Sequence, residues 1–294
     1  MRPRTHSRSG NEITPREPYD EYRFISEFFE SRCTSPEGTV DRLAEILRIR
    51  GFLVEKNEEG SYQLNGFSTS RDIKDFESLM SENDESRLNQ LFRAGSVQNY
   101  EVCHWTNLQY KDLFGSNRRY GDKVDTLSLE PFVARYCKSL ALIGVHTYLS
   151  CDGWHSRRGS RQRIRVGGTL RIGFSDMHSF NWMKILHAND PYLQKLSLRF
   201  NVSNDETWTI PLGSVERRMR IYSQLNEAAE TIYAHRFYYR EIKADVVNSL
   251  KGIRKKGISN EEAYNILLGA FFIALGKRLI ASPNEWRSDI RKFE

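Results

Sequence analysis

The segment RIRVGGTLRIGF, residues 163–174, predicts a β-strand, and its glycine pair Gly167-Gly168 is typical of a bulge or a tight turn. Other segments that predict strands in this part of the chain are residues 144–150, 194–202 and 206–211. Helices are predicted from Ser128, with Pro131 in the first turn, and over residues 176–187. Because single helices separate these strands, the sequence predicts an α+β fold with a central, mostly antiparallel sheet and flanking helices.

The part of the chain before this region predicts mainly helices. A first helix begins near Tyr22, and Thr39 is the expected N-cap of a second helix that ends at Gly51. Residues 52–64 contain two short apolar stretches around a polar turn, which predicts a hairpin. Further elements expected here are helices over residues 70–81 and 85–93 and a strand over residues 97–105.

From Ser214 onward the chain is predicted to be helical. Residues 215–251 favour a single helix, which at 1.5 Å per residue would be roughly 52 Å long. The pattern Ser259-Asn-Glu-Glu262 is a capping box and predicts a last helix that ends near Ile280. The apolar surface of this last helix is too broad for one neighbour, so we expect it to lie between other elements or to meet another subunit.

These elements divide the 294-residue chain into four regions. Residues 1–18 are predicted to be a flexible basic arm, residues 19–95 a mainly helical region with a short hairpin, residues 96–213 a central α+β domain, and residues 214–294 a helical region suited to oligomerisation. The first ten residues lack the apolar core of a signal peptide. The longest apolar run, residues 266–275, is shorter than the roughly 20 residues that span a bilayer, so no membrane contact is expected.

Composition narrows the function only in part. The formal net charge is +6, which is compatible with an acidic partner or with nucleic acid. The cysteines are scattered and include no C-x-x-C pair, which indicates a reduced, cytoplasmic protein without a disulfide framework. Walker, Rossmann, HExxH and GxSxG patterns do not occur, so the common nucleotide-binding, zinc-protease and serine-hydrolase motifs are excluded.

The turn Cys151-Asp-Gly-Trp-His155 brings potential catalytic groups close together in sequence. Cys151 could act as a nucleophile, with His155 as its base and with arginines from Arg157 onward lowering the thiol pKa. The alternative is that Cys151 ends a buried strand and Gly153 makes a turn. A nucleic-acid-processing enzyme that uses Cys151, Asp152 and His155 therefore stays an alternative hypothesis.

Histidine and cysteine also raise the question of a metal site. A zinc site would have to combine Cys151 and His155 with the adjacent pair Cys103-His104, and adjacent residues rarely provide two ligands to one tetrahedral ion. We therefore expect no metal and no cofactor. The single histidines that we expect to be hydrogen-bonded core residues are His146, His178 and His187.

Arginines are concentrated between residues 157 and 171, in a stretch that contains no Asp or Glu. Within the predicted strand, Arg163, Arg165 and Arg171 have the same parity and would project from one face if no bulge intervenes. Guanidinium groups bind phosphate and carboxylate in a bidentate manner, which predicts a site for an acidic or phosphate-bearing partner. The alternative is a solvated loop and sheet edge. The candidate binding residues are Arg157, Arg158, Arg161, Arg163, Arg165 and Arg171.

The helices and hairpin of residues 19–64 offer a third hypothesis, a winged-helix-like DNA-binding protein. The hairpin tip carries Glu58 and Glu59, which would repel phosphate. The second helix presents Arg42, Arg48 and Arg50 beside acidic residues, which is a mixed surface. Direct binding of nucleic acid is therefore possible but not favoured.

The layout of the whole chain resembles that of the Gabija anti-defence family, phage proteins that block the Gabija immune complex of bacteria. The features that carry this resemblance are the polar helical N-terminal part, the central α+β unit with the turn Ser150-Cys-Asp-Gly153, and the long helical C-terminal third. The resemblance implies a non-enzymatic inhibitor in the host cytoplasm. Such an inhibitor binds the Gabija nuclease and helicase subunits, oligomerises around them, and stops them from binding or cutting DNA.

Overall fold

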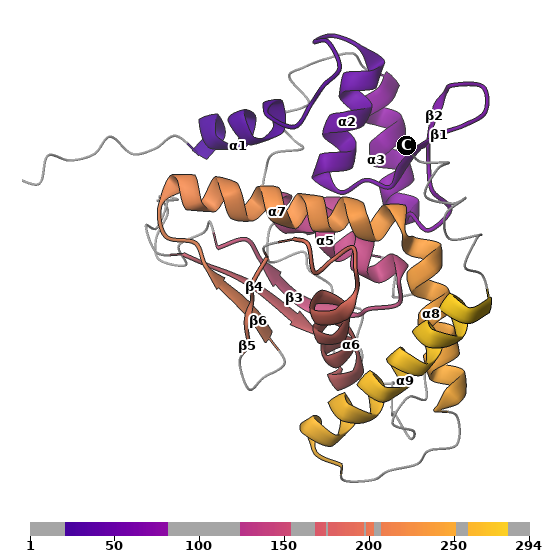
Figure 1. Cartoon of the computed structure of the whole chain (residues 1–294). Helices are drawn as coiled ribbons and strands as arrows, with labels where there is room; N and C mark the ends of the chain where they lie inside the picture. The colour runs from indigo at the N-terminus through magenta and orange to yellow at the C-terminus, as the bar shows by residue number, and fades with distance from the viewer. Residues whose placement is uncertain are drawn as a thin grey trace, which may run out of the picture.

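A computed structural model describes residues 21–81, 124–153, 168–174, 176–196, 198–202, 207–250 and 258–281. Over these ranges the chain has the predicted α+β fold (Figure 1). One sheet has four antiparallel strands in the order β3-β4-β6-β5, and a second sheet is the hairpin β1-β2. The predicted elements over residues 85–93 and 97–105, the basic arm of residues 1–18, and residues 154–167 lie outside the described residues.

The N-terminal elements agree with the sequence prediction because their boundaries are set by local signals. Thr39 is the N-cap of α2, its hydroxyl accepting the backbone N–H of Arg42, and Gly51 ends the helix in the left-handed conformation, with φ at 115°. The elements of this part are α1 (Glu21–Glu30), α2 (Val40–Arg50), β1 (Val54–Lys56), β2 (Tyr62–Leu64) and α3 (Ser70–Ser81).

The helix predicted from Ser128 begins later than expected. Residues Thr126–Ser128 form a short 3-10 helix, and the α-helix α5 covers Pro131–Leu142. Leu129 and Glu130 between them are extended, with ψ near 145° and 143°. A residue before proline is kept out of the helical region by the proline ring, so the α-helix can start only at Pro131.

The central sheet consists of β3 (Thr147–Cys151), β4 (Thr169–Phe174), β5 (Asn201–Val202) and β6 (Thr207–Pro211). Leu170 and Ile172 of β4 and Trp208 and Ile210 of β6 are buried in the core, whereas Arg171 between them is exposed. This alternation is that of a sheet with one face packed against helices. Arg171 is paired with Cys151 of β3 on one side and with Thr209 of β6 on the other.

The strand predicted over residues 194–202 is wrong for most of its length, since only Asn201–Val202 pairs with a neighbour. Residues 191–195 form a turn instead. The carboxylate of Asp190 accepts the backbone N–H groups of Tyr192 and Leu193, each at 3.0 Å, and so folds the chain back after α6 (Met177–Asn189).

The single long helix predicted over residues 215–251 is also wrong. The chain forms α7 (Val215–Ala234) and α8 (Arg236–Ser249), which meet at His235 in a sharp bend (Figure 1). The His235 ring stacks on Tyr192 with a centroid distance of 3.8 Å, and the Tyr239 hydroxyl donates to the buried Asp190 carboxylate at 2.8 Å. These contacts hold the start of α8 against the turn that follows α6 and so fix the bend.

The last helix, α9 (Asn260–Ala281), begins at the predicted capping box. The Ser259 hydroxyl accepts the N–H of Glu262, and the Glu262 carboxylate accepts the N–H of Ser259, each at 3.2 Å. One side of α9 packs on α6 and α8, with Phe271 meeting Trp182 edge to face at 5.8 Å. No helix in the described ranges is both long and apolar enough to cross a membrane.

The buried apolar residues form one cluster that includes members from α1 to α9. The helices α5 and α7 lie side by side over the sheet, and the N-terminal helices lie on the far side of this pair (Figure 1). Phe132 of α5 and Tyr222 of α7 stack at 4.2 Å, and Phe24 and Phe28 of α1 contact both rings. The N-terminal helices are therefore anchored in the same core as the central sheet.

Candidate functional site

The predicted arginine site lies mostly outside the described residues. Arg171 is described and exposed on β4, on the face of the sheet opposite the core. That Arg171 binds an acidic or phosphate-bearing partner stays a prediction. The members that lie outside the described residues are Arg157, Arg158, Arg161, Arg163 and Arg165.

The Cys151-Asp152-Gly153 bend at the end of β3 is held from several directions. The backbone N–H of Asp152 donates to the carboxyl of Glu130 at the start of α5, and the Tyr222 hydroxyl of α7 donates to the Asp152 carbonyl at 2.5 Å. Gly153 has φ at 76°, and a Cβ there would lie 2.7 Å from the backbone of Thr169. The bend requires glycine because β4 begins in the space that a side chain would fill.

Charged groups around this bend are buried to an unusual degree. Asp152 and Arg218 are each 1% exposed, and Arg50 is fully buried. Burial and the neighbouring Asp152 carboxylate raise the pKa of Glu130 to about 9, so one carboxyl of this pair keeps its proton at neutral pH. Sequence reasoning missed Glu130, although a charged residue directly before the N1 proline of an apolar helix was a signal for it.

The environment of Cys151 is unfavourable for a nucleophile. Burial, reinforced by Glu130, raises the pKa of its thiol to about 12. A nucleophilic cysteine needs the opposite shift, because the thiolate is the reactive form. His155, the base that the enzyme hypothesis requires, lies outside the described residues. What the described residues around Cys151 build is a buried support for the bend.

The arginines of α2 each donate a hydrogen bond to a backbone carbonyl of the described chain. Arg42 donates to the Ser35 carbonyl at 3.1 Å and Arg48 to the Val54 carbonyl at 3.0 Å. Arg50 donates to the carbonyls of Thr126 and Leu129, at 3.2 and 2.8 Å. Nearby, Lys138 of α5 pairs with Asp72 of α3 at 2.6 Å, and both side chains are almost fully buried. The Arg50 hydrogen bonds connect α2 to the segment before α5, and the ion pair of Lys138 with Asp72 connects α3 to α5. Both contacts stabilise the fold.

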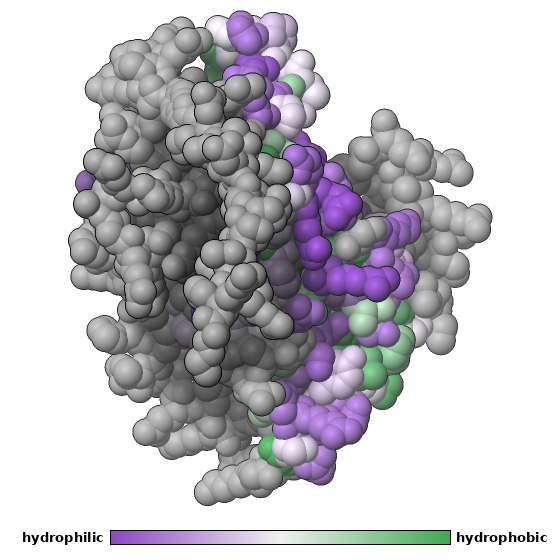
Figure 2. All heavy atoms as spheres, turned by 90° about the vertical axis from the view of Figure 1, so that its left-hand side faces the viewer, coloured by the Kyte–Doolittle hydropathy of each residue, from purple (hydrophilic) through white to green (hydrophobic). Residues whose placement is uncertain are grey.

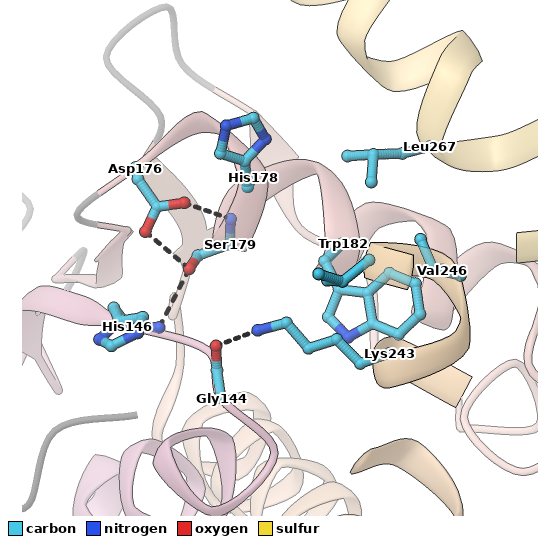
Figure 3. Close-up of a pocket in the computed structure, with 10 residues that line it drawn as sticks. Gly144, His146, Asp176, His178, Ser179, Trp182, Lys243, Val246 and Leu267 are labelled. Atoms are coloured by element: carbon cyan, nitrogen blue, oxygen red, sulfur yellow. Dashed lines mark hydrogen bonds between the residues drawn. The ribbon is translucent and has the colours of Figure 1, made fainter. Parts of the chain in front are cut away.

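A pocket lies between the N-terminus of α6, the loop before β3, and the helices α8 and α9 (Figure 3). Its cavity volume is small, about 40 Å³. Lys243 of α8 reaches across it and donates to the Gly144 carbonyl, while Trp182 and Leu267 form apolar walls. Burial lowers the pKa of Lys243 to about 8, and the nearby Asp176 carboxylate opposes that shift.

The polar groups of this pocket are engaged in capping α6. The Asp176 carboxylate accepts the Ser179 N–H at 2.7 Å and the Ser179 hydroxyl at 2.8 Å (Figure 3). The same hydroxyl accepts the backbone N–H of His146 at 3.1 Å. In this arrangement the Ser179 hydroxyl donates its proton to the Asp176 carboxylate and accepts the backbone N–H of His146. The geometry fits an N-cap that ties the start of β3 to α6.

Of the histidines predicted as core residues, His187 lies against the rings of Phe200 and Trp208, whereas His146 and His178 line the pocket. His187 makes a 2.8 Å hydrogen bond with the Tyr136 hydroxyl, and burial lowers its pKa to about 4, so the ring is neutral. His146 is 4% exposed, and burial lowers the pKa of His178 in the pocket. Among the described residues, no group of three His, Cys, Asp or Glu side chains could hold a metal ion. Cys103, His104 and His155 of the zinc hypothesis lie outside them.

Two of the exposed large apolar side chains in the described ranges are neighbours on the outer side of α9. Phe272 is 50% and Ile273 57% exposed, one turn from the exposed Gly269. By contrast, the described side chains on the face drawn in Figure 2 are mainly hydrophilic, with hydrophobic ones in small groups. Phe237 of α8 is 60% exposed, but the Arg236 and Arg240 guanidinium groups lie 4.6 and 5.5 Å from its ring centre. The outer side of α9 has no such cover from described residues.

Comparison of the chain with protein-family models, with curated proteins and with solved structures returned no match. The function must therefore be argued from the chain's own residues and from the resemblance in layout. Among the described residues, Arg171 on β4 and the side chains of Phe272 and Ile273 on the outer side of α9 are exposed.

Proposed function

We propose that the chain is a binding protein without catalytic activity, a phage-encoded inhibitor that covers a bacterial anti-phage defence complex. The resemblance in layout points to the Gabija nuclease and helicase subunits as the target. In this proposal the protein forms homo-oligomers around the complex and blocks its access to DNA in the host cytoplasm. No cofactor is required, because binding alone produces the effect.

The observation that carries the proposal is the outer side of α9, where Phe272 and Ile273 are exposed on a helix already packed on its other side. Exposed apolar side chains gathered on one element are typical of protein–protein contact surfaces. Arg171 adds a guanidinium suited to an acidic partner. The positive charge of Arg171 would complement an acidic surface of the nuclease complex. Such a surface would either face away from bound DNA or resemble DNA in its charge.

The environment of Cys151 supports a binding role over the enzyme hypothesis. A thiol whose pKa is raised to about 12 is almost entirely protonated at neutral pH and is a poor nucleophile. The engagement of Arg42, Arg48 and Arg50 within the fold supports the same preference over a DNA-reading helix α2. These two observations support the binding role over both alternatives.

The direct test is inhibition of purified Gabija complex. DNA cleavage by the complex is measured while this protein is titrated, and complex formation is followed by co-elution in size-exclusion chromatography. We expect inhibition at stoichiometric concentration and no cleavage by this protein alone. Cys151→Ala should inhibit like the wild type if it folds like the wild type. A complex that stays fully active and elutes separately at micromolar concentrations of this protein would overturn the proposal.

Charge reversal tests the contribution of the arginines. Arg171→Glu should weaken inhibition about tenfold or more, because truncating or reversing an interface arginine costs more than about 1 kcal/mol at many hot spots. Arg220→Glu is the matched control, since Arg220 is also exposed but lies on α7. If both substitutions weaken inhibition equally, the net charge of the protein is responsible and Arg171 on β4 has no specific role.

A further inference from the structure

We infer that the outer side of α9 binds the same surface of a second copy of this chain, in an antiparallel helix pair with a two-fold axis between Phe272 and Ile273. The inference deepens the proposed self-association by assigning it a surface and a geometry. It can be tested without the defence complex, so its failure is distinguishable from failure of the proposed inhibition.

The outer side of α9 has the spacing of a helix-packing seam. The residues along it are spaced alternately three and four positions apart in the sequence. This is the spacing of the first and fourth positions of a coiled-coil heptad. These residues are Glu262, Asn265, Gly269, Phe272 and Gly276. The buried side of α9 shows the same spacing in Ala263, Leu267, Ala270 and Ala274, which pack inside the chain. The helix therefore has two packing sides, and the described residues occupy one of them.

The glycines on the outer side indicate that another backbone comes close. A Cβ on Gly269 or Gly276 would meet no atom of the described chain within 4 Å, so neither glycine is needed for packing within one copy. Glycine inside a helix nevertheless makes folding less favourable than alanine would. Small residues on one helix side let a second helix approach closely, and a large side chain such as Phe272 can then fill the hole they leave.

The order of residues along the outer side of α9 favours a second copy of the same helix, running antiparallel to the first. Gly269-x-x-Phe272-Ile273-x-x-Gly276 is symmetric about its centre, so a two-fold axis there places each glycine opposite the other glycine of the partner helix. In a parallel pair the acidic first turns, with Glu261 and Glu262, would lie side by side and repel each other. The antiparallel pair separates them and brings each toward the end of α9 that carries Lys277.

The size of the surface predicts a weak dimer. A helix of 22 residues is about 33 Å long and about 10 Å wide, so each copy covers on the order of 330 Å². Twice this area is below the roughly 1,200 Å² of stable interfaces. We therefore expect a dissociation constant in the micromolar range for the chain alone, which assembly on a common target would strengthen.

The first experiment is sedimentation velocity of the full chain over about 1 to 200 µM, a range chosen for a weak interface. We expect a concentration-dependent dimer that Phe272→Glu weakens at least tenfold, with unchanged circular dichroism because the side chain is exposed. Phe237→Glu is the matched control and should leave the dimer unchanged. A wild-type chain that stays monomeric throughout this range, or a dimer that resists Phe272→Glu, overturns the inference.

A second pair of variants tests direction. In a background with Cys33 and Cys103 replaced by serine, Ile273→Cys should form a disulfide-linked dimer on mild oxidation, because the two copies of this position meet at the axis. Asn265→Cys should not, since fifteen residues of rise separate its copies by about 22 Å in the antiparallel pair. Cross-linking by Asn265→Cys, or failure of Ile273→Cys to cross-link, would overturn the antiparallel geometry.

Gly276→Ala separates association from folding. It should raise the ratio of folded to unfolded isolated chain about fivefold, because alanine favours the helix. The same substitution should weaken the dimer at least tenfold, since the added methyl group holds the partner backbone away. A variant that folds better and dimerises as well as the wild type would contradict close backbone contact.

Discussion

Replacing Glu130 by glutamine is expected to stabilise the protein at neutral pH, although the side chain is buried and hydrogen-bonded. Glu130 is 6% exposed at the start of α5 and accepts the N–H of Asp152. Burial and the Asp152 carboxylate raise its pKa to about 9. Glutamine keeps an acceptor for that N–H and a donor where the protonated carboxyl had one, but it has no charge to release.

The size of the effect follows from proton binding. Between pH 5 and pH 8 the unfolded chain has an ionised Glu130, with a pKa near 4.3, whereas the folded pair retains one additional proton. The contribution of this group to stability is therefore complete below the unfolded pKa and is lost as the pH rises toward 9. Each pH unit removes about 1.4 kcal/mol, so the advantage of Glu130→Gln should grow by about 4 kcal/mol from pH 5 to pH 8.

The measurement is urea denaturation of both proteins at pH 5, 6, 7 and 8, followed by tryptophan fluorescence. The difference in unfolding free energy is plotted against pH, so any constant effect of glutamine on packing changes the intercept and leaves the slope. Glu37→Gln, at an exposed carboxyl, is the control and should give a flat line. A flat line for Glu130→Gln would refute the claim that this carboxyl pair holds a proton in the folded state.

Two further predictions concern the same bend. Gly153→Ala should lower the free energy of unfolding by about 2 to 5 kcal/mol, combining left-handed strain with overlap against Thr169. Gly60→Ala, at a φ of 84° but in open space, should lose only about 1 to 2 kcal/mol in the same denaturation assay; equal losses would exclude the overlap. Cys151, with its pKa raised to about 12, should resist iodoacetamide at pH 7.5 in the folded protein. Rapid alkylation at this position, located by peptide mass spectrometry, would restore the enzyme hypothesis.

The elements that could be predicted from sequence are those whose ends are set by neighbouring residues. Thr39 and Gly51 bound α2, and Ser259 with Glu262 starts α9, because cap and helix lie within one turn of each other. The alternation of buried and exposed residues along β4 is likewise local.

The elements that could not be predicted depend on contacts between distant residues. The bend at His235 requires Tyr192 and Asp190, which lie more than forty residues away and hold α8 in its new direction. Helix propensity alone continues through this position. In the same way, Arg50 appears on a polar helix surface in sequence, yet Thr126 and Leu129 enclose it in the fold. Lys138, a charge in a largely apolar helix, was a usable signal of a buried ion pair.

The positions of the charges separate stability from binding in this protein. Glu130, Asp152 and Arg218 are almost fully buried around the junction of the sheet, α5 and α7, and Asp72 of α3 is buried against α5. A group buried in this way cannot contact a partner without unfolding part of the chain, and its replacement changes the fold first. Arg171 and the outer side of α9 are exposed, so their replacement should change binding at nearly constant stability. A comparison of unfolding free energy with inhibition across both sets of variants would therefore distinguish an inhibitor from a catalyst. In a catalyst built on Cys151, substitutions at the buried support would abolish turnover before they unfold the chain.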